Sequence, residues 1–385
     1  MLITNAKIIT MADRDIECGF IHVKDGKILQ TGEMTVLTVE DSETVDCSGL
    51  TVYPGFIDAH CHLGMWEEGL GFEGDDGNEM TDPITPHLRA VDAVNPINIS
   101  FDEAVRAGVT TIVTGPGSAN PISGQFCAMK TYGRCIDKML LKEPVAMKFA
   151  LGENPKGCYN DKGQQPTTRM ATAALIRETL HKAKRYMQEL DAAAQDSELD
   201  PPDYDAKLDA LVPVLRKQVK AHFHCHRADD IFTALRISKE FDLDTVLVHC
   251  TEGHMITPEL AEIGAKIICG PMICTRTKPE LSNYTTRTPG ILSQSGLEVA
   301  ICTDYSEIPI EFLAVSAGVA VREGMDHREA LKSITINAAK ICGIDDRTGS
   351  LQAGKDADIV VFKGDPLSLY EKPVMVFAAG KQITL

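Results

Sequence analysis

The sequence lacks several features that would place the protein in a special structural class. It contains no uninterrupted run of about 18 apolar residues, so we expect no membrane-spanning helix. The first residues, MLITNAKIITMADRD, have an early acidic residue and a short apolar run, which is not typical of a secretory signal peptide. The chain has 38 basic and 55 acidic residues, a net charge of −17 and no lysine or arginine run. We therefore expect no binding to nucleic acid or to an anionic membrane.

The cysteines also lack the spacing of a disulfide or zinc-ribbon framework. All twelve are spread over 385 residues, and no Cys-x-x-Cys pair occurs. This distribution is typical of reduced thiols, so we expect a cytoplasmic protein. Hydrophobic residues make up 44% of the chain and charged residues 24%, so it can bury a substantial core and is not disordered.

Both ends of the chain are expected to form β-structure around a different middle. Residues 1–54 contain short apolar runs and the Asp25-Gly26 dipeptide, which is typical of a hairpin turn, and residues 350–385 contain the runs IVVF and VMVF. In residues 55–349, roughly eight apolar runs alternate with helical patterns, which predicts a barrel of parallel strands. A stretch near 160–216, rich in Ala, Lys and Glu, is expected to be a helical insertion.

Histidines are clustered more than chance would give. Random placement of eleven histidines in this chain would give roughly 0.3 His-x-His pairs, whereas three occur. One is His60/His62, and His222, His224 and His226 form the other two. Residues i and i+2 of a strand share one face, so His60 and His62 can direct two imidazoles at one metal ion.

Further metal-ligand types follow later predicted strands. His224 ends QVKAHFH, His249 ends DTVLVH and Asp304 ends LEVAICTD. In a parallel barrel the carboxyl ends of the strands form one rim, so these residues are expected to meet His60 and His62 there. Imidazole and carboxylate ligands suit one or two Zn²⁺ ions, with Mn²⁺, Ni²⁺ or Fe²⁺ as alternatives.

Lys148, in VAMKFALGEN, leaves two interpretations open. An ammonium group would be repelled by a metal cluster, but desolvation and nearby cations lower a lysine pKa. The neutral amine can add carbon dioxide and become a carbamate anion that bridges two metal ions. Alternatively Lys148 is an ordinary solvated or salt-bridged lysine, and the carboxylate of Glu153 is the bridging ligand.

Two segments resemble the metal-dependent amidohydrolase superfamily. PGFIDAHCHLG is similar to the first-strand motif of that superfamily, and SITINAAKICGIDDRTGSLQAGKDADIVVFKGDP is similar to its last helix and its return to the β-domain. The resemblance implies an α/β fold, a distorted (β/α)8 TIM barrel at 55–349 plus a small β-sandwich domain built from 1–54 and 350–385. It implies this set of metal ligands, with Lys148 carboxylated: His60, His62, Lys148, His224, His249 and Asp304.

Within the superfamily the chain looks closest to imidazolonepropionase-like and prolidase-like hydrolases. We therefore expect a metal-dependent hydrolase that cleaves an amide bond in a small-molecule substrate, which is a dipeptide, an N-acyl amino acid or a cyclic amide. Metal-activated water would attack, with Asp304 as the general base. The alternatives are a mononuclear aminohydrolase (deaminase) acting on a heterocycle and a non-enzymatic scaffold relative. A homo-oligomer is also expected.

Other side chains near the predicted rim are candidates for substrate contact. His226 shares a strand face with His224, and His254 follows the strand that ends at His249. Trp66 lies in a long acidic loop after His62, and Arg276 is the expected local cation for a substrate carboxylate.

Overall fold

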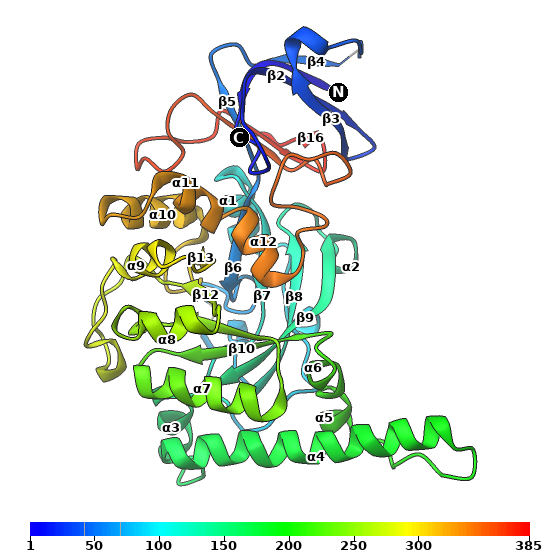
Figure 1. The fold of residues 1–385 in the computed structure, drawn as a ribbon, viewed down its shortest axis with the longest axis vertical. Helices are drawn as coiled ribbons and strands as arrows, with labels where there is room; N and C mark the ends of the chain where they lie inside the picture. Colours follow the sequence, from blue (N-terminus) through cyan, green and yellow to red (C-terminus); the bar gives the residue numbers. More distant parts are fainter. Residues whose placement is uncertain (42, 70) are drawn as a thin grey trace.

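The chain forms a β-domain and a barrel. The structure, a computed structural model, describes residues 1–41, 43–69 and 71–385. Figure 1 shows both termini in the β-domain at one end of the molecule and a long helix, α4, at the other. No helix in the described residues is long and apolar enough to cross a membrane.

The two ends of the chain share one sheet. Its strands, in the order of the sheet, are β16 (Lys381–Gln382), β15 (Met375–Ala378), β14 (Ile359–Phe362), β5 (Thr51–Pro54), β1 (Leu2–Ile8), β2 (Ile16–Lys24) and β3 (Lys27–Glu33), with β4 (Thr44–Asp46) paired to β1. β5 and β14 pair antiparallel, which joins the amino-terminal strands to the carboxyl-terminal ones. The hairpin predicted at Asp25-Gly26 connects β2 and β3, and both turn residues have the positive φ that such a turn requires.

Eight further strands form the barrel. They are β6 (Phe56–Cys61), β7 (Val109–Thr114), β8 (Ile122–Lys130), β9 (Leu140–Ala150), β10 (Lys220–Cys225), β11 (Thr245–His249), β12 (Lys266–Cys269) and β13 (Val299–Ile301), hydrogen-bonded in chain order. The barrel closes where the segment after β13 meets β6: Asp304 N donates to His60 O (3.3 Å) and His62 N donates to Tyr305 O (2.8 Å). The predicted fold class is confirmed.

One strand differs from the predicted parallel arrangement. β8 runs antiparallel to both β7 and β9, whereas the other neighbouring strands are parallel. Only residues 115–121 connect β7 to β8, and only residues 131–139 connect β8 to β9. Parallel neighbours need a crossover of roughly a dozen residues or more, so these short connections impose hairpins and distort the barrel.

Helices cover the barrel. They are α1 (Ile99–Arg106), α2 (Ile136–Met139), α3 (Glu153–Asn160), α4 (Arg169–Gln195), α5 (Ala206–Asp209), α6 (Val212–Leu215), α7 (Ala228–Phe241), α8 (Thr257–Glu262), α9 (Thr288–Gln294), α10 (Leu313–Arg322), α11 (His327–Ser333) and α12 (Ile336–Cys342). The helices α4, α5 and α6 lie in the predicted insertion near 160–216, and α3 precedes it after β9. α4 begins at an N-cap where Thr168 Oγ1 accepts from Ala171 N, and it buries Ile176, Leu180 and Ala183, which share one helical face.

Candidate metal centre

The carboxyl ends of the barrel strands surround a cavity of about 550 Å³. The predicted site residues that line it are His62, Trp66, Lys148, His224, His226, His249 and Asp304. They come from β9, β10 and β11 and from the segments after β6, β10 and β13. A parallel strand delivers its carboxyl end to this rim, so residues far apart in the sequence become neighbours.

The first cluster joins the first and last strands of the barrel. Ligand atoms of His60, His62 and Asp304 all lie within 4.8 Å of one another. Asp304 Oδ1 lies 3.4 Å from His62 Nε2 and 3.7 Å from His60 Nε2, and it is buried without a hydrogen-bond partner. Two nitrogens around an unpartnered buried carboxylate oxygen fit a shared cation, so this donor set suits a metal ion.

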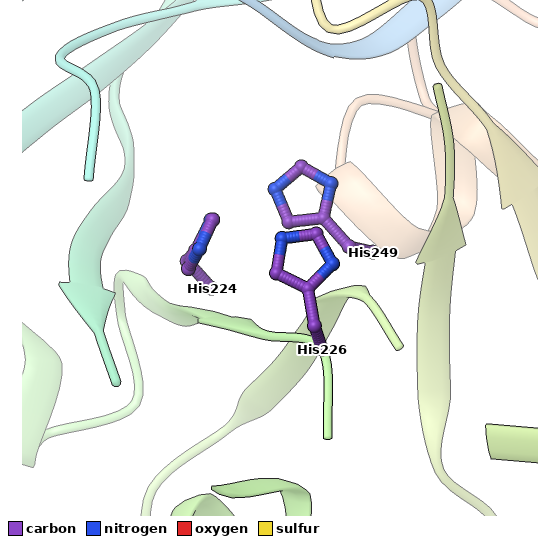
Figure 2. Close-up of side chains that lie close together, drawn as sticks. All are labelled: His224, His226 and His249. Atoms are coloured by element: carbon purple, nitrogen blue, oxygen red, sulfur yellow. The ribbon is translucent and has the colours of Figure 1, made fainter. Parts of the chain in front are cut away.

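The second cluster comes from β10 and β11. Ligand atoms of His224, His226 and His249 also lie within 4.8 Å of one another, and Figure 2 shows the three rings around a common space. The ring centroids are 4.5–4.7 Å apart, and the rings of His226 and His249 stack at 12°. His60 and His249 are neighbours at 5.8 Å between ring centroids, so the two clusters adjoin.

Backbone carbonyls orient two of these imidazoles. His62 Nδ1 donates to Gly115 O (2.6 Å), and His249 Nδ1 donates to Gly270 O (2.8 Å). Since a carbonyl oxygen only accepts, Nδ1 must carry the proton in both rings, and the lone pair of each neutral ring is on Nε2. Such partners are typical of metal-bound histidines, because they hold the ring and its tautomer.

Burial keeps most of the imidazoles neutral. It is the main cause that lowers the pKa of His60, His224 and His226 well below the usual value, and it lowers the pKa of His249 to about 4. A neutral imidazole has the lone pair that a metal ion needs. The donor chemistry of the cavity therefore fits bound metal.

Asp304 stays ionised in the same environment. Burial raises its pKa, but the interactions of its carboxylate with His249, His62 and Lys148 outweigh that effect and lower the pKa below its usual range. Its backbone is left-handed (φ 54°), a conformation that non-glycine residues seldom adopt outside turns and functional sites. Asp58 supports this segment, because its carboxylate accepts hydrogen bonds from Thr303 N (3.1 Å) and Thr303 Oγ1.

Lys148 lies on β9, between the two clusters. Its side chain is 1% exposed, and Nζ donates to His60 Nε2 at 2.9 Å. Burial lowers the pKa of Lys148 to about 8, although Asp304 opposes the change. A substantial fraction of the amine is therefore neutral near pH 8, which is the form that can react with carbon dioxide.

Glu153, the alternative bridging ligand, lies at the first position of α3. Its Oε2 accepts a hydrogen bond from Glu280 N (3.3 Å), and Glu153 N donates to Glu280 Oε2 (3.0 Å). Among the described residues, Glu153 is not in the lining of the cavity. The geometry therefore favours Lys148 over Glu153 as the group between the clusters.

The candidates for substrate contact are placed differently from one another. Trp66 packs edge-on against His62 at 4.7 Å between ring centroids, and its Nε1 donates to Asp75. Arg276 is exposed and donates to Tyr284 O (2.7 Å), and His254 Nδ1 donates to Thr251 O (3.1 Å). In the described part of the chain, neither Arg276 nor His254 lines the cavity.

Three other residues in or beside the cavity were not singled out in the sequence. Lys278 lines it and contacts Asn154 Oδ1 (2.9 Å) and Glu280 Oε1 (2.7 Å). Asn154 also lines the cavity and donates to Ser118 Oγ (2.7 Å). Lys278 and Glu280 follow the same predicted strand as Arg276. A second cation and a nearby acid in that loop are the sequence feature that could have identified them as candidate site residues.

Comparison with known proteins identifies the family. The profile described as "Amidohydrolase family" matches residues 51–384. The chain belongs to the amidohydrolase family. The crystal structure of an amidohydrolase from Thermotoga maritima MSB8 is similar to this fold over 100% of this chain and 99% of that chain, with 39% identity and a TM-score of 0.94.

Two curated relatives extend the comparison. "Amidohydrolase tasK" of Hapsidospora irregularis is 28% identical over 393 residues, and the match covers 96% of this chain and 39% of that protein. The chain thus spans well under half the length of this relative. An imidazolonepropionase of Mesorhizobium japonicum is 23% identical over 392 residues, covering 93% of this chain and 90% of the relative.

These findings confirm the resemblance to the amidohydrolase superfamily. Membership makes the chain a metal-dependent hydrolase of carbon–nitrogen bonds. The histidine clusters fit the divalent metal that the family generally binds.

Proposed function

We propose that the protein hydrolyses an amide bond in a small molecule, which is a dipeptide, an N-acyl amino acid or a cyclic amide. The observation that carries this proposal is the position of Asp304. Its unpartnered Oδ1 lies between His60 and His62, beside the cavity and next to a second histidine cluster. A carboxylate among neutral imidazoles is the arrangement expected of a general base beside a metal ion.

The residues that would hold metal form two groups. One ion is expected at His60, His62 and Asp304, and a second at His224 and His249, with Lys148 between them. Zn²⁺ suits these nitrogen and oxygen donors, and Mn²⁺, Ni²⁺ or Fe²⁺ are alternatives. When bound, metal at this site supplies a Lewis acid that lowers the pKa of water and polarises a carbonyl group.

Asp304 would move the proton. Its carboxylate is ionised because its pKa lies below the usual range, so it can accept the proton that water loses on attack. The same carboxyl group then donates that proton to the leaving nitrogen, and the amide is converted to a carboxylate and an amine. Hydrogen bonds from Thr303 to Asp58 hold the backbone next to Asp304 during both transfers.

Lys148 would carry a carbamate. Its neutral amine attacks carbon dioxide, a C–N bond forms, and one proton is released to solvent, so the side chain becomes an anion. The lowered pKa and the 2.9 Å contact with His60 support this step, because the amine is buried beside the first cluster and loses its proton more readily than a solvated lysine. An anion there would offset part of the charge of two metal ions.

The cavity supports a small substrate with a polar end. Its volume of about 550 Å³ is within the usual range for small-molecule sites. Lys278 and Asn154 lie on one side of it, and Trp66 forms an apolar wall near His62. We expect Lys278, instead of Arg276, to be the cation nearest a substrate carboxylate.

A substrate screen tests the proposal. Zinc-loaded protein is incubated with dipeptides, N-acyl amino acids, hydantoin-like rings and imidazolones, and products are identified by mass spectrometry. We expect turnover in one of these classes and none with Asp304→Asn. Ammonia release from a heterocycle, with one ion per chain and unmodified Lys148, would instead support the mononuclear aminohydrolase. Metal-loaded protein inactive on every class would contradict the proposal.

We further propose that the protein works in a reducing compartment, as expected for the cytoplasm. All twelve cysteines are free thiols, and eight of them are buried. Burial raises the pKa of several of these thiols, including Cys61, Cys225 and Cys250, which keeps them protonated and unreactive.

A further inference from the structure

His226 has no role in the proposed mechanism, although it is part of the second histidine cluster. Two imidazoles and the group on Lys148 would be enough to hold the second ion. Yet His226 is only 4% exposed, and its ligand nitrogen lies within 4.8 Å of those of His224 and His249. Figure 2 shows its ring beside that of His249, with the ring of His224 facing both.

The hydrogen-bond partner of His226 Nδ1 is compatible with ligation through Nε2. His226 Nδ1 lies 2.7 Å from Thr251 Oγ1, and His249 Nδ1 donates to Gly270 O. If the threonine hydroxyl accepts, Nδ1 of both stacked rings carries a proton, and both Nε2 atoms have free lone pairs. Parallel rings at 4.6 Å then present the same edge to the same space. This pattern of one fixed and one free nitrogen is the one that protein ligands of zinc show.

A buried carboxylate adjoins the same nitrogens. Glu280 Oε1 lies 3.6 Å from His226 Nε2 and 3.9 Å from His224 Nε2, and Glu280 is 1% exposed. Two ligands held at ~2.0–2.1 Å from a tetrahedral ion lie ~3.3–3.4 Å apart. The three ligand nitrogens lie within 4.8 Å of one another, so they must move closer together to share one ion, and the Glu280 carboxylate lies beside them.

We propose that His226 is a metal ligand, so that His224, His226 and His249 form a three-imidazole site for Zn²⁺ beside Glu280. The inference rests on the proposed function only in requiring that the protein binds metal. It means that the second ion is held by three imidazoles even when Lys148 is not modified.

Metal counting in a background without the other site tests the inference. In His62→Asn the first cluster loses a nitrogen ligand, so the ion that remains is the one at the second cluster. His226→Gln is then added, because glutamine keeps a polar group near Thr251 but removes the imidazole. Stripped proteins are reloaded with Zn²⁺, passed through gel filtration and analysed for zinc per chain. His181→Gln, an exposed histidine on α4, is the matched control.

We expect one zinc per chain in His62→Asn and in His62→Asn/His181→Gln, but more than tenfold weaker zinc binding in His62→Asn/His226→Gln. The midpoint of thermal unfolding should rise with added zinc in the first two proteins and not in the third. Equal zinc content and an equal thermal shift in all three would overturn the inference, and His226 would then be a residue that contacts substrate.

X-ray absorption covers the case in which the double variant does not fold. In zinc-loaded His62→Asn, His226 is intact, and the spectrum counts the imidazoles around the ion. Three imidazoles support the inference, whereas two overturn it. Both measurements are independent of hydrolysis. Metal-loaded protein that cleaves no amide would contradict the proposed function but not the three-imidazole site. An active enzyme with only two imidazoles at the second ion would contradict the three-imidazole site but not the proposed function.

Discussion

At the scale of single residues, burial acts on Asp304 and Lys148 with opposite results. Both groups lie in the same cavity, where loss of solvent disfavours any charge. Asp304 remains an anion because imidazoles and Lys148 surround it, whereas burial lowers the pKa of Lys148 to about 8. The same cavity thus supplies a carboxylate to accept a proton and an amine that can change its charge by a chemical modification.

The first prediction concerns Asp304. We expect Asp304→Asn to lower kcat by a factor of about 10² to 10⁴, because an amide cannot accept the proton of water. The side chains are nearly isosteric, so the thermal unfolding midpoint should change little. Steady-state kinetics on the substrate found by the screen, with circular dichroism, measure both. Asp161→Asn, an exposed aspartate, is the control. A kcat near that of the wild type would disprove the role.

The second prediction concerns Lys148. We expect Lys148→Ala to lower the metal content from two ions to one per chain, because the carbamate that holds both is lost. Bicarbonate should speed the reconstitution of stripped wild-type protein and have no effect on the variant. A crystal structure at neutral pH should show extra planar atoms beyond Nζ. Density for Glu153 between two ions, with a bare Lys148 amine, would refute the carbamate.

At the scale of secondary-structure elements, an ion-pair network joins the β-domain to the barrel. Lys130, at the end of β8, contacts Asp358 and lies 3.0 Å from Asp356, in the segment before β14. Asp356 also contacts Lys27 of β3 (2.5 Å) and Arg347 (3.0 Å). β8 reaches this end of the barrel because it runs antiparallel to its neighbours, so the reversed strand also connects the two domains.

The third prediction follows from this network. Burial raises the pKa of Asp356, but Lys130, Lys27 and Arg347 lower it to about 2 overall. A depressed folded-state pKa stabilises the protein above the unfolded value of 3.8, and this stabilisation is lost as pH falls towards 2. We expect Asp356→Asn to lose about 2 kcal/mol of unfolding free energy at pH 7, since one pKa unit is about 1.4 kcal/mol.

Chemical denaturation at several pH values measures this effect. The difference between wild type and Asp356→Asn should be full at pH 7 and should shrink between about pH 4 and pH 2. Asp346→Asn, an exposed aspartate in the preceding segment, should show little difference at any pH. A difference that is constant with pH would mean that the network does not act through the charge of Asp356.

At the scale of the whole molecule, several buried polar groups without a hydrogen-bond partner lie together at the cavity. Buried atoms without a hydrogen-bond partner in the described residues include His60 Nδ1, His224 Nδ1 and Asp304 Oδ1, all at or beside the cavity. Each such group lowers stability unless something pairs with it. These groups therefore lower the free energy of unfolding of the metal-free barrel, and a bound cation can offset that loss.

The fourth prediction is that metal removal destabilises the whole protein. Ligand binding to the folded state adds about 4 kcal/mol of stability when free metal is 1,000 times Kd. Calorimetry of chelator-treated protein should show a lower thermal unfolding midpoint, and added zinc should restore it. The Asp304→Asn/His226→Gln double variant should respond much less to zinc. An unfolding midpoint that is equal with and without metal would exclude a structural contribution from the ion.

The main architecture and the residue types of the site could be predicted from the amino-acid sequence. Apolar runs with period and length typical of buried strands predicted the barrel, and the Asp25-Gly26 turn predicted the hairpin between β2 and β3. The carboxyl ends of parallel strands lie at one rim of a barrel. Residues that end predicted strands, such as His60 and Asp304, could therefore be expected to lie together although they are far apart in the chain.

The neighbours of those residues, in contrast, depend on how the strands and loops pack in the folded chain. Apolar content does not specify strand direction, so the antiparallel course of β8 came from short connections. The conformation of the loop after β12 places Lys278 in the lining of the cavity. Arg276, in the same loop, is exposed and donates a hydrogen bond to a backbone carbonyl oxygen. His226 and His224 lie near His249 because β10 and β11 are adjacent in the barrel. The spacing of residues within one strand does not reveal such a contact between strands.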